Sequence, residues 1–176
     1  MIRTLLAAVL LAPLIPSALA AQRWESFALQ GAVGPGTGLG GPQARHRSGA
    51  ALDLLFTLRT REGLLVGAAA GMQGAFTYGD VCVTDPEGEC LPDFPFLTSV
   101  GVVAGSELGS GLRALGGAEL FIHDENDRAM GLTGRLTARL ADSRIAPVAT
   151  FRAAFLPFYR DEVLLLLSLG VGLRVR

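Results

Sequence analysis

Hydrophobic and polar residues alternate one by one along residues 131–140, whose sequence is GLTGRLTARL. Every second residue from Leu132 to Leu140 is apolar or small. The residues between them are polar, namely Thr133, Arg135, Thr137 and Arg139. A helix would distribute these polar side chains over several of its sides, whereas a strand places them on one face. The period of two therefore predicts a strand with one apolar face and one polar face.

Seven more segments of similar composition occur, and clusters of Gly, Pro and charged residues separate them. The predicted strands are Trp24–Gly34, Gly49–Thr60, Leu64–Thr77, Phe96–Ser106, Gly111–Ile122, Gly131–Ala141, Pro147–Pro157 and Val163–Val175. Eight is the smallest strand number usual for a closed transmembrane barrel, and closure removes the edges through which sheets aggregate. The predicted fold is all-β, an eight-stranded antiparallel up-and-down transmembrane β-barrel.

Isolated charges lie among small residues on the polar side of most segments, opposite a continuous apolar face. The residues on this side include Asp53, Thr57, Arg59, Arg113, Glu119, Thr150, Arg152, Ser168 and Arg174. In a membrane barrel, lipid contacts the apolar face, so the sparse charges must pair with one another in a narrow lumen. Glu119, Arg135 and Arg152 are expected at similar heights on consecutive strands. Together with Asp53 they are predicted to form ion pairs that fill the lumen.

The first 21 residues have the features of a cleaved secretory signal peptide. One positive charge, Arg3, precedes an apolar run from Leu5 to Ile15, and the sequence Ser17-Ala18-Leu19-Ala20 places small residues before a cleavage position. Pro13 and Pro16 interrupt the run, which makes it a poor membrane-spanning helix. Residues 1–21 are predicted to be a signal peptide, and residues 22–176 a single outer-membrane β-barrel domain.

Short and long links alternate between the predicted strands, as they do in barrels with short periplasmic turns and long extracellular loops. The short links are residues 61–63, 107–110 and 142–146, and the long links are residues 35–48, 78–95 and 123–130. The link at residues 158–162 is short and departs from this order. With the N-terminus on the periplasmic side, the long links face outward.

Aromatic residues are predicted to form a belt at each end of the barrel wall, where the membrane meets water. Trp24, Phe27 and Phe56 mark the periplasmic side. The outer belt comprises Phe76, Tyr78, Phe94, Phe96, Phe121, Phe155, Phe158 and Tyr159.

The link at residues 78–95 combines cysteines with carboxylates. Cys82 and Cys90 are predicted to form a disulfide in an oxidising compartment, since two thiols without a nearby His make at most half of a zinc site. The acidic residues of this outer loop are Asp80, Asp85, Glu87, Glu89 and Asp93. A solvated loop is the preferred interpretation, and a divalent-cation or partner site is the alternative, because no recognised calcium-loop spacing occurs. No metal and no cofactor are predicted.

Two further motifs contain residue types found in nucleotide-binding or catalytic sites. Gly36, Gly38 and Gly41 have the spacing of a dinucleotide site, but no helix that would hold the phosphates follows them. They are interpreted as part of a flexible outer link. His46 and Ser48 are of the types that acyl transfer uses, yet no carboxylate is identifiable as the group that would orient the His. No catalytic residue is predicted.

The signal peptide, the eight alternating segments and the unequal links together resemble the small outer-membrane β-barrel proteins, the class that includes the OmpA- and OmpX-like barrels. The resemblance is architectural and covers nearly all of residues 22–176. It implies location in the outer membrane of a Gram-negative envelope, contact with outer-membrane lipids and insertion by the barrel-assembly machinery. Such barrels often end in an aromatic residue that the machinery reads, whereas this chain ends Arg174-Val175-Arg176.

The predicted function is non-enzymatic: a barrel with a plugged lumen that has a structural role in the envelope or binds an extracellular partner through its loops. A barrel this narrow is not expected to be a general porin. The net charge of −1 provides no basic surface for nucleic acid. Two alternatives stay open. One is a lipid-modifying outer-membrane enzyme, and the other is a soluble periplasmic lipocalin-like barrel, which would need the Leu-rich face inside and the charges outside.

Overall fold

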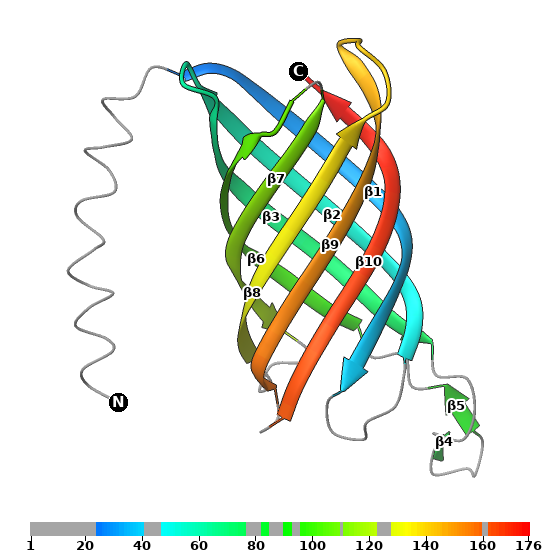
Figure 1. Cartoon of the computed structure of the whole chain (residues 1–176). Coiled ribbons are helices and arrows are strands. Elements are labelled where there is room, and N and C mark those ends of the chain that lie inside the picture. The colour runs from blue at the N-terminus through cyan, green and yellow to red at the C-terminus, as the bar shows by residue number, and fades with distance from the viewer. Residues whose placement is uncertain are drawn as a thin grey trace, which may run out of the picture.

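Eight long antiparallel strands form a closed barrel in the computed structural model of the chain (Figure 1). The structure describes residues 24–40, 47–76, 82–84, 90–92, 96–109, 111–122, 128–159 and 162–176. The predicted signal peptide lies outside these residues. None of the described residues belongs to a helix that is long and apolar enough to cross a membrane.

The strands follow one another around the barrel in an up-and-down order, and the first strand pairs with the last. The barrel strands are β1 (Trp24–Gly40), β2 (Arg47–Thr60), β3 (Leu64–Phe76), β6 (Phe96–Glu107), β7 (Leu112–Ile122), β8 (Arg128–Arg139), β9 (Ile145–Tyr159) and β10 (Glu162–Val175). Between β3 and β6, a separate pair is formed by β4 (Cys82–Thr84) and β5 (Cys90–Pro92). The prediction of an eight-stranded antiparallel barrel is confirmed.

β1 extends beyond its predicted end at Gly34 and includes the first two glycines of the G-x-G-x-x-G motif. Gly36 pairs with Gly49 of β2 and with Ser168 of β10. A methyl group added at Gly36 would meet the Ala51 methyl at 3.2 Å, so glycine allows close packing inside the wall. The interpretation of these glycines as a flexible outer link is therefore wrong for Gly36 and Gly38, and Gly41 lies outside the described residues.

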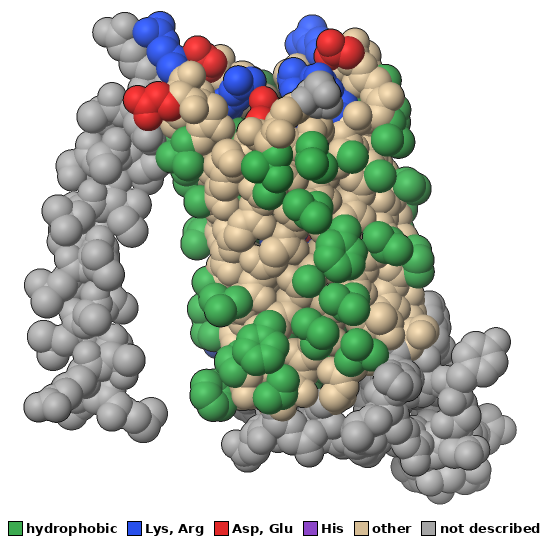
Figure 2. Space-filling model, viewed as in Figure 1, with side chains coloured by type: hydrophobic (Ala, Val, Ile, Leu, Met, Phe, Trp, Pro, Cys, Tyr) green, Lys and Arg blue, Asp and Glu red, His purple; other side chains and the backbone are tan. Residues whose placement is uncertain are grey.

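All but two of the charged strand residues whose side chains the structure describes occupy inward-facing positions. The inward-facing ones are Asp53, Arg59, Glu107, Arg113, Glu119, Arg135, Arg139, Arg152 and Arg174. The two exceptions are Glu25, the second residue of β1, and Arg128, the first residue of β8. Figure 2 shows the result: hydrophobic side chains cover the wall, and charges gather at the end with the short turns. Leu132, Leu136 and Val102 are among the exposed apolar residues of the wall.

The aromatic residues follow the predicted belts in part. Phe96, Phe155 and Phe158 are exposed on the wall, as are Trp24, Phe27 and Phe56 toward the opposite end. Phe76 (side chain), Tyr78 and Phe94 lie outside the described part. The assignment of Phe121 to the outer belt is wrong, because Phe121 shares the inward parity of Glu119 and is only 1% exposed. Tyr159 is partly buried and packs against the same interior cluster as Phe121.

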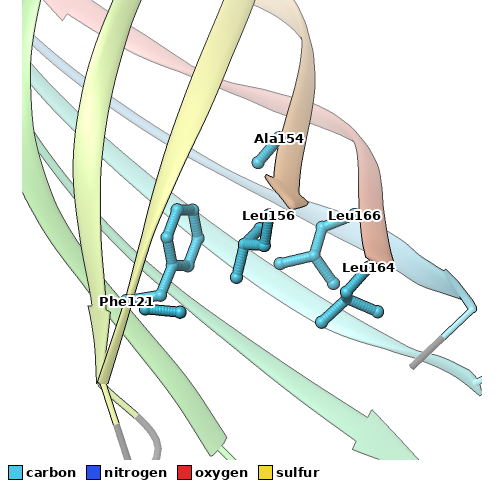
Figure 3. Close-up of a cluster of buried hydrophobic side chains, with 6 residues drawn as sticks. Phe121, Ala154, Leu156, Leu164 and Leu166 are labelled. Carbon is cyan, nitrogen blue, oxygen red and sulfur yellow. The ribbon is translucent and has the colours of Figure 1, made fainter. Parts of the chain in front are cut away.

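Two apolar clusters pack inside the barrel. The first consists of Phe121, Ala129, Ala154, Leu156, Leu164 and Leu166. In Figure 3 the labelled members of this cluster point toward one another from the inner faces of their strands. The second consists of Leu55, Leu65, Ala69, Val103 and Leu115, and Leu65 is the second residue of β3, close to the short turn between β2 and β3. The interior therefore contains packed side chains at more than one height.

Candidate functional site

Four charged side chains meet in the middle of the barrel interior. Asp53 extends from β2, Glu119 from β7, Arg135 from β8 and Arg152 from β9, and we call these four residues the mid-lumen cluster. Their side chains are at most 6% exposed. The alternating pattern positions them, because each lies on the inward parity of its strand.

Arg135 joins the two carboxylates of the mid-lumen cluster. Its Nη2 lies 2.9 Å from Asp53 Oδ1, and its Nε donates to Asp53 Oδ2 at 3.1 Å. Its Nη1 lies 2.5 Å from Glu119 Oε1 and also donates to Thr133 Oγ1 at 3.1 Å. One planar guanidinium with several donors is suited to such a bridge, which a lysine could not reproduce.

Arg152 completes the cluster from the opposite side of Glu119. Its Nη2 lies 2.5 Å from Glu119 Oε2 and donates to Ser99 Oγ at 2.8 Å. Its Nε is 3.9 Å from Asp53 Oδ1. The guanidinium carbon also lies 5.6 Å from the centre of the Phe121 ring, within the range of a cation–π contact. The cluster thus touches the first apolar cluster through Phe121.

The mid-lumen cluster contains two acids and two arginines, so its formal charges cancel. Each carboxylate accepts hydrogen bonds or ion pairs from at least one guanidinium, and Thr133 donates to Glu119 Oε1 at 3.0 Å. Arginine stays protonated in proteins, so neither arginine can act as a general base. The arrangement is suited to holding strands together across the lumen rather than to transferring protons.

A second charged group surrounds the carboxylate of Glu107 at the short-turn end. We call it the short-turn mouth, and it consists of Glu107, Arg59, Arg113, Arg139, Arg174 and Arg176. Arg113 donates to Glu107 Oε1 from Nε at 2.8 Å and from Nη2 at 2.6 Å. Arg59 Nη1 lies 3.0 Å from Glu107 Oε2, and Arg176 Nη2 lies 3.8 Å from Oε1. Burial, followed by the charges of Arg139 and Arg113, lowers the pKa of Arg176 below its ordinary value.

Sequence reasoning did not identify Glu107 as a partner for these arginines, because it placed this residue in a short link. The structure instead makes Glu107 the last residue of β6. The sequence pattern could have predicted its inward orientation. Ser99 and Val103 are buried on the inner face of β6, and Glu107 lies an even number of residues from both, on the same face.

Uncharged polar residues lie between the two charged groups and were also missed as contacts. Gln30 Nε2 donates to Thr137 Oγ1 at 3.3 Å, and Thr137 and Thr150 hydroxyls lie 3.4 Å apart. Arg113 Nη1 donates to Thr57 Oγ1 at 3.4 Å. These contacts use side chains from five strands, so they tie distant parts of the wall together.

The remaining candidate residues fall largely outside the described part of the chain. The backbone of Cys82 pairs with Pro92 and that of Cys90 with Thr84, while the side chains of both cysteines lie outside the description, so the disulfide stays a prediction. Ser48 lies in β2 and is exposed. In the described residues, no group of three His, Cys, Asp or Glu side chains is placed to hold a metal. The candidates outside the described residues are His46, Asp80, Asp85, Glu87, Glu89 and Asp93.

The barrel is similar to solved structures, although no protein-family model and no curated protein sequence matches the chain. Neisserial surface protein A (NspA) is 13% identical with a TM-score of 0.61, over 88% of this chain and 99% of NspA. Ail, the attachment invasion locus protein of Yersinia pestis, is also 13% identical, with a TM-score of 0.51 over 85% of this chain and 99% of Ail. A further Ail structure, in complex with the heparin analogue sucrose octasulfate, has a TM-score of 0.50 at 11% identity over the same shares of the two chains. The chain has the fold of the small eight-stranded outer-membrane barrels. The resemblance predicted from the sequence is confirmed at this level.

Proposed function

We propose that this chain is an integral outer-membrane β-barrel without enzymatic activity, whose lumen is closed and whose role is structural or lies in contacts at the cell surface. One observation carries the proposal. Between the two ends of the wall, the described outer face bears apolar residues, whereas the charged residues point inward. This distribution matches an environment of lipid around the barrel.

The energetics of the wall favour lipid over water. An Arg or Lys on the lipid face costs about 2–4 kcal/mol near the bilayer midplane, so a spanning barrel keeps its charges inside. A soluble lipocalin-like barrel would require the opposite arrangement. Here Leu132 and Leu136 are 64% and 46% exposed, while Arg135 between them is 2% exposed. The soluble alternative is therefore disfavoured.

The contents of the lumen favour a closed barrel over a pore. The mid-lumen cluster crosses the interior from β2 to β7, β8 and β9 through ion pairs between nearly fully buried side chains. The two apolar clusters add packed side chains at other heights. Eight-stranded barrels have interiors that side chains can fill, so passage of solutes would require these contacts to open.

The outer links are the proposed surface of contact with other molecules. With the short turns in the periplasm, the link that contains Cys82 and Cys90 faces outward and carries the five acidic residues of the acidic outer loop. Ail binds sucrose octasulfate in one of the structures named above. A polyanion of that kind would be repelled by the acidic link here, so we expect a cationic partner at the surface instead.

The test is fractionation of cells that export the full chain, combined with thiol labelling after mild reduction. We expect recovery in the outer membrane, a shift in gel mobility that depends on boiling, and labelling of Cys82 and Cys90 from outside intact cells. A variant that carries Cys82→Ser, Cys90→Ser and Glu62→Cys provides the matched control. Its single thiol lies in the short turn after β2, so it should be labelled only after the outer membrane is opened.

Two results would contradict the proposal. Recovery as a soluble periplasmic protein would mean that the apolar wall does not face lipid. A steady ionic conductance of the purified protein in planar bilayers would mean that the lumen is open, while leaving the membrane location intact.

A further inference from the structure

Arg174 lies buried in the short-turn mouth without a hydrogen-bond partner among the described residues. The residue is 1% exposed, and none of its three guanidinium nitrogens has a partner. A buried guanidinium carries five N–H donors and a full charge, which interiors tolerate only when they are satisfied. The other buried arginines, Arg113, Arg135 and Arg152, all have carboxylate partners.

The neighbours of Arg174 increase the positive charge instead of balancing it. The positive charges of Arg113, Arg176 and Arg139 repel the guanidinium of Arg174, and Glu107 is the carboxylate that attracts it. Glu107 is already engaged with Arg113, Arg59 and Arg176. The mouth therefore has five arginines and one inward-facing carboxylate, with Asp142 paired to Arg139 at its exposed edge.

Gln30 cannot satisfy Arg174 by itself. Its backbone is paired with that of Arg174 across β1 and β10, and its carbonyl oxygen also lacks a hydrogen-bond partner. One amide oxygen accepts at most two hydrogen bonds, fewer than the five that this guanidinium offers. A group with several acceptor oxygens and a negative charge would satisfy Arg174 and reduce the repulsion around it.

We propose that the short-turn mouth binds a small oxyanion, a phosphate or a carboxylate, with Arg174 at the inner end of the site and Arg113 and Arg139 beside it. The side chains of Arg59 and Arg176 are 35% and 34% exposed, so they lie on the solvent side of the site, where an entering anion would compete with Glu107 for them. The site differs from the mid-lumen cluster, whose charges already cancel.

The experiment uses the refolded full barrel in a non-ionic detergent that contains no phosphate. Unfolding temperature is measured in inorganic phosphate, in sodium acetate and in sodium chloride at equal ionic strength. A fourth sample has chloride buffer and micelles doped with phosphatidylglycerol. We expect a saturable rise in unfolding temperature with an oxyanion beyond that with chloride, and loss of this rise in Arg174→Met.

Arg61→Met is the matched control, because Arg61 lies in an exposed turn at the same end of the barrel. It should respond like the unchanged protein. A rise with phosphate or acetate supports a free anion as the ligand, whereas a rise only in doped micelles supports a lipid headgroup. No rise in any sample, or an equal rise in Arg174→Met, would overturn the proposal.

A direct measurement covers the case in which Arg174→Met does not refold. The ³¹P resonance of inorganic phosphate should broaden on addition of the unchanged barrel and less so with Arg139→Met. Equal broadening by both proteins would contradict the site. So would no broadening, if the unfolding temperature also fails to rise in acetate and in doped micelles. Neither measurement depends on membrane orientation, so failure here leaves the proposed outer-membrane location untouched.

Discussion

The mid-lumen cluster and the short-turn mouth use the same residue types to different effect. In the mid-lumen cluster two arginines meet two carboxylates, and each arginine lies within 2.5–3.2 Å of at least one nearly fully buried carboxylate. In the mouth three of the five arginines share Glu107, and the Arg174 guanidinium has no hydrogen-bond partner among the described residues. Both groups are held by the same alternation of inward and outward residues.

The contrast shows that position on the inward face does not by itself make an arginine stabilising. Removing one partner from a buried pair leaves an uncompensated charge, which costs much more than the pair itself contributes. We therefore expect the mid-lumen cluster to be sensitive to single substitutions. The contribution of the short-turn mouth to stability should depend instead on ions in the solvent, because the side chains at its rim are partly exposed.

Arg135→Met should have the largest effect. It removes the bridge between Asp53 and Glu119 and leaves the two buried carboxylates with Arg152 alone. The expected loss in the free energy of unfolding is about 3–5 kcal/mol. It is measured by urea unfolding in lipid vesicles, with the boiling-dependent gel shift as the readout.

The charge-balanced double variant sharpens this prediction. Adding Asp53→Asn to Arg135→Met leaves Glu119 with Arg152, which restores neutrality and should recover a large part of the loss. If the double variant is less stable than Arg135→Met, charge balance is not what stabilises the cluster.

Phe121→Ala should have the next largest effect on stability. Phe121 packs in the first apolar cluster and lies against Arg152, so its truncation opens a cavity and weakens a neighbour of the mid-lumen cluster. The expected loss is about 3 kcal/mol. Phe155→Ala is the comparison, because Phe155 lies on the outer wall and is 42% exposed. Both losses are measured by urea unfolding. A larger loss for Phe155→Ala than for Phe121→Ala would contradict the interior position of Phe121.

A single added methyl group distinguishes the two faces of the wall. At Gly71 it would meet Arg152 Nη1 at 2.7 Å and Ser99 Oγ at 3.0 Å, so Gly71→Ala must displace Arg152 from its contacts. We expect a loss of about 1–3 kcal/mol. At Gly134, on the outer face, a methyl group meets nothing within 4 Å, and Gly134→Ala should change stability by less than about 0.5 kcal/mol. Equal losses in the same unfolding assay would contradict the packing described around Arg152.

Salt should have the smallest effect, and the effect should come from the mouth. Sodium chloride screens the repulsion among the arginines, so stability should rise with its concentration, by less than about 1 kcal/mol. Glu107→Gln removes the shared carboxylate and should enlarge this rise. Glu62→Gln, in the exposed turn at the same end, should not. If Glu107→Gln does not change the rise in stability with sodium chloride, that rise does not come from the arginines of the short-turn mouth.

The alternating pattern was sufficient to predict the strands and the inward face, because one residue of slippage would turn every side chain to the opposite side. It also selected Asp53, Glu119, Arg135 and Arg152, which the structure brings together. Strand ends were harder to predict. From composition, Gly36 is predicted to lie in a loop and Glu107 in a turn. In the structure, pairing with neighbouring strands extends β1 to include Gly36 and β6 to include Glu107. The prediction that Phe121 belongs to the outer belt considered only its position near the end of the strand. Phe121 is two residues from the inward-facing Glu119, so its side chain also faces inward.

The most direct test of the account is the lipid exposure of the wall, measured by tryptophan fluorescence in vesicles with lipids brominated at defined depths. Trp24 is the chain's one tryptophan and lies at the start of β1. In the unchanged protein, bromines near the headgroups should quench it most. In a variant with Trp24→Phe and Leu136→Trp, bromines near the bilayer centre should quench most, because Leu136 faces outward and pairs with Phe151 near the middle of β9. If the tryptophan at position 136 is not quenched by lipid at any depth, the apolar wall does not face the membrane and the central claim fails.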